Sequence, residues 1–296
     1  MTRMRADLLL LLTAFIWGTA FVAQKIANEK VGPATFVGVR FLISAFALLP
    51  FFLNEQKRQK TAMTTRDICI ASVVAACLFI GAMLQQIGML TTTATNAGFL
   101  TALYVVLVPF VVWVTTRHRP KILVVAACLI SVLGAYLLAG HGVGQSFAIG
   151  DAMMIVADFA WATGIALVPV FLKNTHRPYF LSFMQFGITG GLALCGGFIF
   201  ETVNLSAILS IWPSILYAAI ISGSIAYTLQ IIGQRYTPAA EAAIILSLES
   251  VFAAIAGAAV LQERLTTVAI FGCGLILCGV VLVEIGPILF RPRTSA

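Results

Sequence analysis

The sequence predicts an all-α membrane protein in which ten transmembrane helices form two inverted five-helix repeats. Only 10% of the 296 residues are charged, against about 25% in soluble domains. The mean hydropathy of +1.02 excludes a water-soluble globule. The apolar residues form long continuous blocks, and two short runs, LQQIG at 84–88 and LQIIG at 229–233, indicate that the chain resembles itself.

The apolar blocks have the length that a helix needs to cross a bilayer, about 17–25 residues. Their continuous hydrophobicity favours helices over membrane strands, in which apolar and polar residues alternate. The ten predicted helices span residues 7–27, 33–53, 67–90, 94–116, 120–139, 150–172, 178–200, 211–234, 238–260 and 267–288. The first block follows two arginines, as in a signal peptide, but it runs to Lys25 without a small-residue cleavage site, so we expect a retained helix.

Basic residues mark one side of the predicted membrane protein. The N-terminus, the even-numbered loops and the C-terminal tail hold 14 of the 18 basic residues: Arg3, Arg5, Lys57, Arg58, Lys60, Arg66, Arg117, Arg119, Lys121, Lys173, Arg177, Arg235, Arg291 and Arg293. By the positive-inside rule, both termini are expected in the cytoplasm. This topology explains the net charge of +7, so no nucleic-acid partner is expected.

A shift of 144 or 145 positions aligns the two halves of the chain. It matches Asp7, Phe15 and Trp17 with Asp151, Phe159 and Trp161; Pro33 and Phe41 with Pro178 and Phe186; Leu84, Gln85, Ile87, Gly88 and Thr92 with Leu229, Gln230, Ile232, Gly233 and Thr237; and Cys128 and Gly134 with Cys273 and Gly279. The same shift places Arg40 opposite Gln185. An odd number of helices per half makes the repeats inverted, and we assign them to residues 1–143 and 144–296.

Inverted repeats of this kind hold substrates near the membrane midplane, between the halves. The alternative is a duplicated bundle without a pore. Small residues would pack helices closely in either case; they include Gly98, Gly187, Gly190, Gly191, Gly223, Gly272 and Gly274.

Several sequence runs carry a family resemblance over residues 7–285. They are the IWGTAF run before Lys25, Pro33 followed by Arg40, the run TTTATNAGFLTALYVVLVP, and LQERLT near the end. The chain thereby resembles EamA-type permeases of the drug/metabolite transporter superfamily. The resemblance implies a ten-helix inner-membrane permease, with export of amino acids or other small metabolites. Two positions depart from the family pattern: Ser250 replaces a frequent proline, and the loop at Arg117–Arg119 lacks the acidic residue that Glu263 supplies in the second half.

Charged side chains within the predicted helices are expected to have a partner or a function, because inserting each one into the membrane costs about 2.5–3.5 kcal/mol on insertion scales. Lys25 lies near a helix end and can snorkel to the interface. Arg40 lies about 10 Å inside the helix that begins at Pro33. We expect Arg40 to pair with Asp158 or with a substrate carboxylate; bonds to backbone carbonyls are the structural alternative.

Glu249 lies at the centre of the predicted helix 238–260. Burial at this depth favours the neutral carboxyl group, so Glu249 is a candidate proton carrier for coupled transport. A protonated glutamic acid that braces a neighbouring helix is the alternative. Glu241, near the helix start, is expected to interact favourably with the helix dipole.

Aromatic and amide side chains form the remaining candidate lining of a substrate site. The full candidate set for substrate binding is Trp17, Arg40, Gln85, Asn96, Tyr104, Asp158, Trp161, Tyr227 and Gln230. Aromatic walls and amide groups suit a small zwitterionic or amphipathic solute. The same side chains could instead serve as polar contacts between helices.

Catalytic and cofactor chemistry is not expected. His118, His141 and His176 lie in predicted loops beside no cysteine or paired carboxylate, so neither a metal site nor an activated nucleophile is predicted. The six cysteines are interpreted as packing residues. The glycine-rich stretch 140–144 follows a membrane helix and is interpreted as an outer loop, and no ATP-binding motif is present.

The sequence therefore favours a secondary transporter that moves a small organic metabolite, and the family resemblance implies amino acids as the leading class and export as the expected direction. Its expected partners are the substrate and the lipid bilayer, and the chain could act as a monomer or a homodimer. A non-transporting membrane scaffold or assembly protein is the alternative function. An intramembrane enzyme is disfavoured by the lack of a catalytic constellation.

Overall fold

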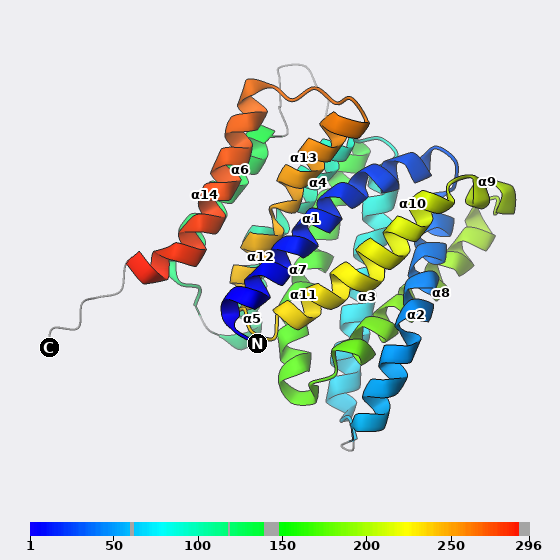
Figure 1. Ribbon diagram of the computed structural model, residues 1–296, viewed down its shortest axis with the longest axis horizontal. Coiled ribbons are helices and arrows are strands. Elements are labelled where there is room, and N and C mark those ends of the chain that lie inside the picture. Colours follow the sequence, from blue (N-terminus) through cyan, green and yellow to red (C-terminus); the bar gives the residue numbers. More distant parts are fainter. Residues whose placement is uncertain (60–61, 118, 139–147, 290–296) are drawn as a thin grey trace, which may run out of the picture.

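The computed structural model describes residues 1–296 except 60–61, 118, 139–147 and 290–296. Within the described residues every regular element is a helix, and the helices pack as one bundle (Figure 1). They are α1 (Arg3–Asn28), α2 (Pro33–Arg58), α3 (Thr65–Gly88), α4 (Ala94–Thr101), α5 (Tyr104–Thr116), α6 (Ile122–Leu138), α7 (Ile149–Thr175), α8 (Pro178–Phe200), α9 (Leu205–Ser210), α10 (Trp212–Leu216), the π-helix η1 (Tyr217–Tyr227), α11 (Thr228–Gly233), α12 (Ala239–Leu246), α13 (Glu249–Val260) and α14 (Thr267–Leu289). The predictions for His118, His141, the loop 140–144 and the repeat boundary at 143/144 lie outside the described residues.

Eight helical segments are long and apolar enough to cross a membrane: Arg3–Asn28, Pro33–Arg58, Thr65–Gly88, Ala94–Thr115, Ile149–Thr175, Pro178–Phe200, Trp212–Gly233 and Ala239–Val260. Two further helices, Ile122–Leu137 and Thr267–Val283, are apolar but shorter within the part of the chain that the structure describes. The predicted all-helical membrane fold is therefore confirmed, and the prediction of ten spans stays a prediction.

Two predicted continuous helices are interrupted at equivalent places. The segment 94–116 divides into α4 and α5 at Ala102 and Leu103, and the segment 238–260 divides into α12 and α13 at Ser247 and Leu248. At both interruptions an N–H group bonds to the carbonyl three residues back, as in a 3₁₀ turn. Such a turn needs no glycine or proline, so the sequence carries no signal for it. The two interruptions are 145 residues apart, which fits the internal repeat.

The predicted helix 211–234 contains an 11-residue π-helix, η1. Its wider turns expose carbonyl groups to neighbouring helices. Ser44 of α2 donates to the Ala219 carbonyl at 2.7 Å, and Thr13 of α1 donates to the Ala226 carbonyl at 3.2 Å. The π-helix is thereby bonded to both α1 and α2, and segments of this kind are frequent at functional sites.

The main packing contacts join one helix from each half. They pair α2 with α8, α3 with α7, α1 with α13, and α6 with α14 (Figure 1). Within the α2–α8 pair, Glu201 at the end of α8 accepts bonds from Ala34 N and Thr35 N at the start of α2, at 2.8 and 2.9 Å. Glu55 of α2 accepts from Tyr179 N and Phe180 N at the start of α8, at 3.1 and 2.7 Å. Each helix end thus supplies a carboxylate to the unpaired N–H groups of the other, so the two helices run antiparallel.

Glycine supports close packing at some of the predicted positions and not at others. A Cβ at Gly190 would lie 2.7 Å from Leu42 N, and one at Gly98 would lie 2.5 Å from Ala253 Cβ. By contrast, a Cβ at Gly187, Gly191 or Gly274 would meet no atom within 4 Å. The prediction that these last three glycines pack helices together is therefore wrong: Gly274 is exposed, and Gly187 and Gly191 are half-buried beside open space.

Candidate functional site

A cavity lies in the middle of the bundle, between helices of both halves. Its empty volume is about 710 Å³, which includes space open to the surroundings. From the first half, the lining residues are Trp17, Ala20, Phe21 and Gln24 of α1; Arg40 of α2; Val74, Cys77, Leu78 and Gln85 of α3; Thr101 of α4; and Tyr104 of α5. From the second half, they are Ala160, Trp161, Gly164, Ile165 and Val168 of α7; Gln185 of α8; Ser222 and Tyr227 of η1; Gln230 of α11; and Glu249 of α13.

The predicted site residues gather at this cavity with two exceptions. Trp17, Arg40, Gln85, Tyr104, Trp161, Tyr227, Gln230 and Glu249 line it. Asn96 does not; it lies in the first turn of α4, where its backbone N–H donates to Thr93 Oγ1 at 3.1 Å. Asp158 is 1% exposed and likewise is not part of the lining.

Tyr227 is the centre of an aromatic cluster on the cavity wall. The centroid of its ring lies 4.6 Å from that of Trp17, 5.6 Å from Phe186 and 6.5 Å from Trp161. Trp17 Nε1 donates to the Ser222 carbonyl of η1 at 3.1 Å, which fixes its indole. Trp161 Nε1 is buried without a hydrogen-bond partner in the described structure, so one aromatic donor on the cavity wall is unused.

Arg40 is a buried cation on the cavity wall. Its residue is 5% exposed, and its guanidinium carbon lies 4.7 Å from the centroid of the Phe41 ring and 5.3 Å from that of Phe36. These contacts stabilise the charge by cation–π attraction. The expected pair with Asp158 is not present in the described residues, because both carboxyl oxygens of Asp158 lack hydrogen-bond partners. The other predicted partner, a substrate carboxylate, stays a prediction.

Amide side chains from both halves reach the cavity at equivalent positions. Gln85 of α3 donates to Gln24 Oε1 at 3.2 Å, and Gln230 of α11 donates to Gln234 Oε1 at 2.9 Å. Gln234 in turn donates to the Ile165 carbonyl of α7 at 3.1 Å. That carbonyl lacks its usual helical donor because residue 169, four positions on, is proline. Each equivalent glutamine is therefore held by a second glutamine close to the cavity.

Glu249 is the first residue of α13 and lies directly after the turn that interrupts the helix. It is 3% exposed, it lines the cavity, and its Oε1 atom has no hydrogen-bond partner in the described part of the chain. With the 145-residue shift its equivalent is Tyr104, the first residue of α5. Tyr104 and Glu249 therefore place a polar side chain on the cavity wall from equivalent positions of the two interrupted helices.

Lys25 does not snorkel to the interface. Its Nζ atom donates to the Met89 and Thr92 carbonyls at 2.8 and 2.7 Å, just beyond the end of α3. These carbonyls have no partner within the helix, and a lysine there interacts favourably with the negative end of the helix dipole. Nearby, Gln86 Nε2 donates to Asn28 Oδ1 at 2.7 Å, so polar side chains bind α1 to α3 at this end of the bundle.

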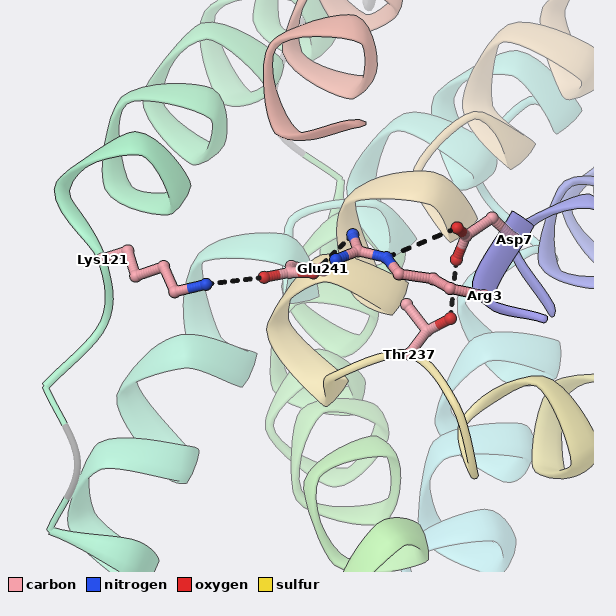
Figure 2. A network of polar contacts seen from close by, with 5 residues as sticks. All are labelled: Arg3, Asp7, Lys121, Thr237 and Glu241. Carbon is pink, nitrogen blue, oxygen red and sulfur yellow. Dashed lines mark hydrogen bonds and ion pairs between the residues drawn. The ribbon is translucent and has the colours of Figure 1, made fainter. Parts of the chain in front are cut away.

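A second polar network lies at the other end of α1, where the start of that helix meets the start of α12. Figure 2 shows Arg3 between Asp7 and Glu241, with Lys121 on the other side of Glu241. The Arg3–Glu241 distance is 2.7 Å and the Lys121–Glu241 distance is 3.7 Å. Glu241 lies in the first turn of α12, as predicted, and it also joins α12 to α1 and to the residue that precedes α6.

Comparison with known proteins identifies the family. The EamA-like transporter family matches residues 4–140 and again residues 148–285. The chain belongs to the EamA-like transporter family. The chain is 36% identical to an "Uncharacterized transporter" of Archaeoglobus fulgidus over 286 residues, covering 96% of this chain and 87% of that protein. It is 26% identical to a "Probable amino-acid metabolite efflux pump" of Salmonella typhimurium, covering 97% and 96% of the two chains.

A solved crystal structure has the same fold, with a TM-score of 0.78 and 17% identity over 99% of each chain. The resemblance to EamA-type permeases is confirmed by these matches, and the protein is a multi-pass membrane protein of a transporter family. The two family matches fit an internal repeat. No group of three or more His, Cys, Asp or Glu side chains suited to a metal ion occurs among the described residues, and the cysteines are free thiols.

Some polar residues of this EamA-like cavity were not predicted as site residues: Gln24, Thr101, Gln185 and Ser222. Two of them had a signal in the sequence. Gln24 follows Trp17 by seven residues, or about two helical turns, and so shares its face. Gln185 is the repeat equivalent of Arg40. Ser222 had none, because its carbonyl reaches Trp17 only through the geometry of η1.

Proposed function

We propose that this EamA-like protein is a secondary transporter of small organic metabolites, with amino acids as the leading substrate class and export as its direction. It would work by alternating access, in the inner membrane, with both termini in the cytoplasm. The observation that carries this proposal is the central cavity, which is lined from both halves by a buried cation, several amides and an aromatic cluster. A bundle that only braced the membrane would gain nothing from these costly polar groups.

The cavity chemistry supports a substrate with a carboxylate. Arg40 is the candidate anchor, because its buried guanidinium has ring faces beside it and no carboxylate partner in the described residues. Gln85 and Gln230 are candidate hydrogen-bonding groups, and Trp17, Trp161 and Tyr227 are candidate walls for the apolar part of the solute. The name of the Salmonella relative, an amino-acid metabolite efflux pump, points in the same direction at low identity.

Ten spans in two inverted repeats, 1–143 and 144–296, would provide the alternating motion. Three features support this arrangement: two family matches, helix interruptions at equivalent residues, and antiparallel packing of the equivalent helices α2 and α8. Glu249 is the candidate proton carrier, since its carboxyl at the cavity wall could release its proton and, as the carboxylate, take one up again as the halves rock.

The test is uptake of a labelled amino-acid panel into liposomes that contain the purified protein, with and without a pH gradient. Saturable uptake of at least one amino acid is expected, with a faster initial rate under the gradient. Trp161→Ala should reduce it at least tenfold, while the matched control Trp212→Ala, at a residue that is 58% exposed on the outside of the bundle, should leave it unchanged. Equal uptake by the two variants would count against the cavity as the substrate site, and no uptake of any small metabolite would favour a non-transporting scaffold. Saturable uptake without a response to pH would remove the proton role.

A further inference from the structure

Two buried carboxyl groups and a tyrosine hydroxyl lie beside the cavity, and both carboxyl groups have oxygens without a hydrogen-bond partner among the described residues. Asp158 of α7 is 1% exposed, and neither of its carboxyl oxygens accepts a hydrogen bond in the described structure. Glu249 of α13 has one such oxygen, and its polar neighbour is the hydroxyl of Tyr104 of α5, which is 2% exposed. Polar atoms at this depth are normally satisfied, so a group of this kind points to something that it binds.

The three side chains form one cluster. The Tyr104 hydroxyl interacts electrostatically with Glu249 and with Asp158, and the two carboxyl groups interact with each other. The packing explains this: α7 contacts both α4 and α5, and α4 contacts α13. Tyr104 and Glu249 lie at the same repeat position, directly after the two helix interruptions, so they reach the cluster from equivalent backbone sites.

If both carboxyl groups were ionised, no neighbouring cation among the described residues would balance their negative charges. Arg40 is the buried cation on the cavity wall, but its guanidinium lies against the rings of Phe36 and Phe41, and no ion pair joins it to either carboxyl in the described residues. Of the other titratable groups on the wall, Tyr227 belongs to η1 and Cys77 to α3, and the lining residues of α1 and α4 carry no charge. Two like charges close together in the membrane interior cannot both persist, and the usual solution is that they share a proton.

We propose that Asp158 and Glu249, with the Tyr104 hydroxyl, form a binding site for one shared proton. Glu249 exchanges this proton with the cavity, which it lines, and Asp158 is the second carboxyl behind it. The site offers few oxygens, whereas hard metal cations take about six or more, so a proton fits it better than a metal ion. A role of this proton in transport rests on the proposed function, but the binding of the proton can be measured in the purified protein without transport.

The test is a pH titration of the purified protein in detergent, followed by infrared absorption of protonated carboxyl groups and by tryptophan fluorescence. Wild type should show two coupled steps. Asp158→Asn should leave one step, displaced by about one pH unit or more from either wild-type midpoint, and Glu249→Gln should remove the step that fluorescence detects. Tyr104→Phe, which keeps the ring, should displace both midpoints without removing a step.

The matched control is Asp151→Asn, because Asp151 is a buried aspartate of the same helix that accepts a bond from Ala148 N at 2.9 Å. It should leave both midpoints unchanged. An Asp158→Asn titration identical to that of wild type would overturn the proposal, even in a protein that transports amino acids. Midpoints that move with Na⁺ concentration at constant ionic strength would also overturn it, in favour of a sodium site. Coupled steps in a protein without uptake would support the proton site and count against the transport function alone.

Discussion

Neutralising Glu201 should loosen the packing of α2 against α8. Its carboxylate accepts three bonds at the start of α2: from Ala34 N at 2.8 Å, Thr35 N at 2.9 Å and Thr35 Oγ1 at 2.7 Å. Hydrogen bonds to charged groups contribute about 1.5–3 kcal/mol and neutral ones about 0.5–1.5 kcal/mol. Glu201→Gln keeps one acceptor oxygen but removes the charge. Because the site is partly open to solvent and the bonds are not additive, the expected loss is about 1–2 kcal/mol.

The assay is thermal unfolding in detergent, for which about 1 kcal/mol corresponds to roughly 2–4 °C in a chain of this size. Glu201→Gln should therefore lower the apparent melting temperature by about 3–6 °C at one fixed heating rate. The control is Glu29→Gln, which neutralises an exposed carboxylate in the turn before α2 and should change it by less than about 1 °C. Equal melting temperatures for the two variants would refute the argument that Glu201 stabilises the start of α2.

Three further changes test other contacts by the same assay. Lys25→Met should destabilise by about 1.5–3 kcal/mol, because the Met89 and Thr92 carbonyls lose a charged donor; Lys30→Met, at an exposed neighbour, should be neutral. Gly190→Ala should cost about 1–3 kcal/mol by contact with the Leu42 backbone, whereas Gly191→Ala should be neutral or stabilising; equal effects would contradict the packing. A double-mutant cycle of Arg3→Gln and Glu241→Gln should give a coupling of about 1 kcal/mol that falls in high salt, and no coupling would mean that the pair in Figure 2 is dispensable.

Helix positions and most cavity residues could be predicted because both depend on local pattern. A continuous apolar block about 20 residues long predicts a membrane helix whatever packs on it. A tryptophan or a charge far from a helix end predicts a buried polar contact, and Trp17, Arg40 and Glu249 do line the cavity. These inferences needed only the depth of a residue in the membrane, which follows from the number of residues between it and the end of its helix.

Contacts between helices could not be predicted, because they depend on rotation and register. Arg40 and Asp158 seemed suitable partners by depth, yet Arg40 packs on Phe36 and Phe41, and Asp158 interacts with Glu249. Lys25 has two backbone carbonyls as partners, which no side-chain pattern reveals.

The two family matches fit an internal repeat, and the residues that line the cavity differ between equivalent positions of the two halves. At the equivalent positions 40 and 185 one half has arginine and the other glutamine, and at 104 and 249 one half has tyrosine and the other glutamic acid. All four side chains line the same cavity. A fully symmetric pair of repeats would make the two faces of the membrane equivalent, so its outward-open and inward-open states would have the same energy. Because Arg40 and Glu249 each occur in only one half, a transporter with two such states would hold these groups in different surroundings in each, so the two states would differ in energy.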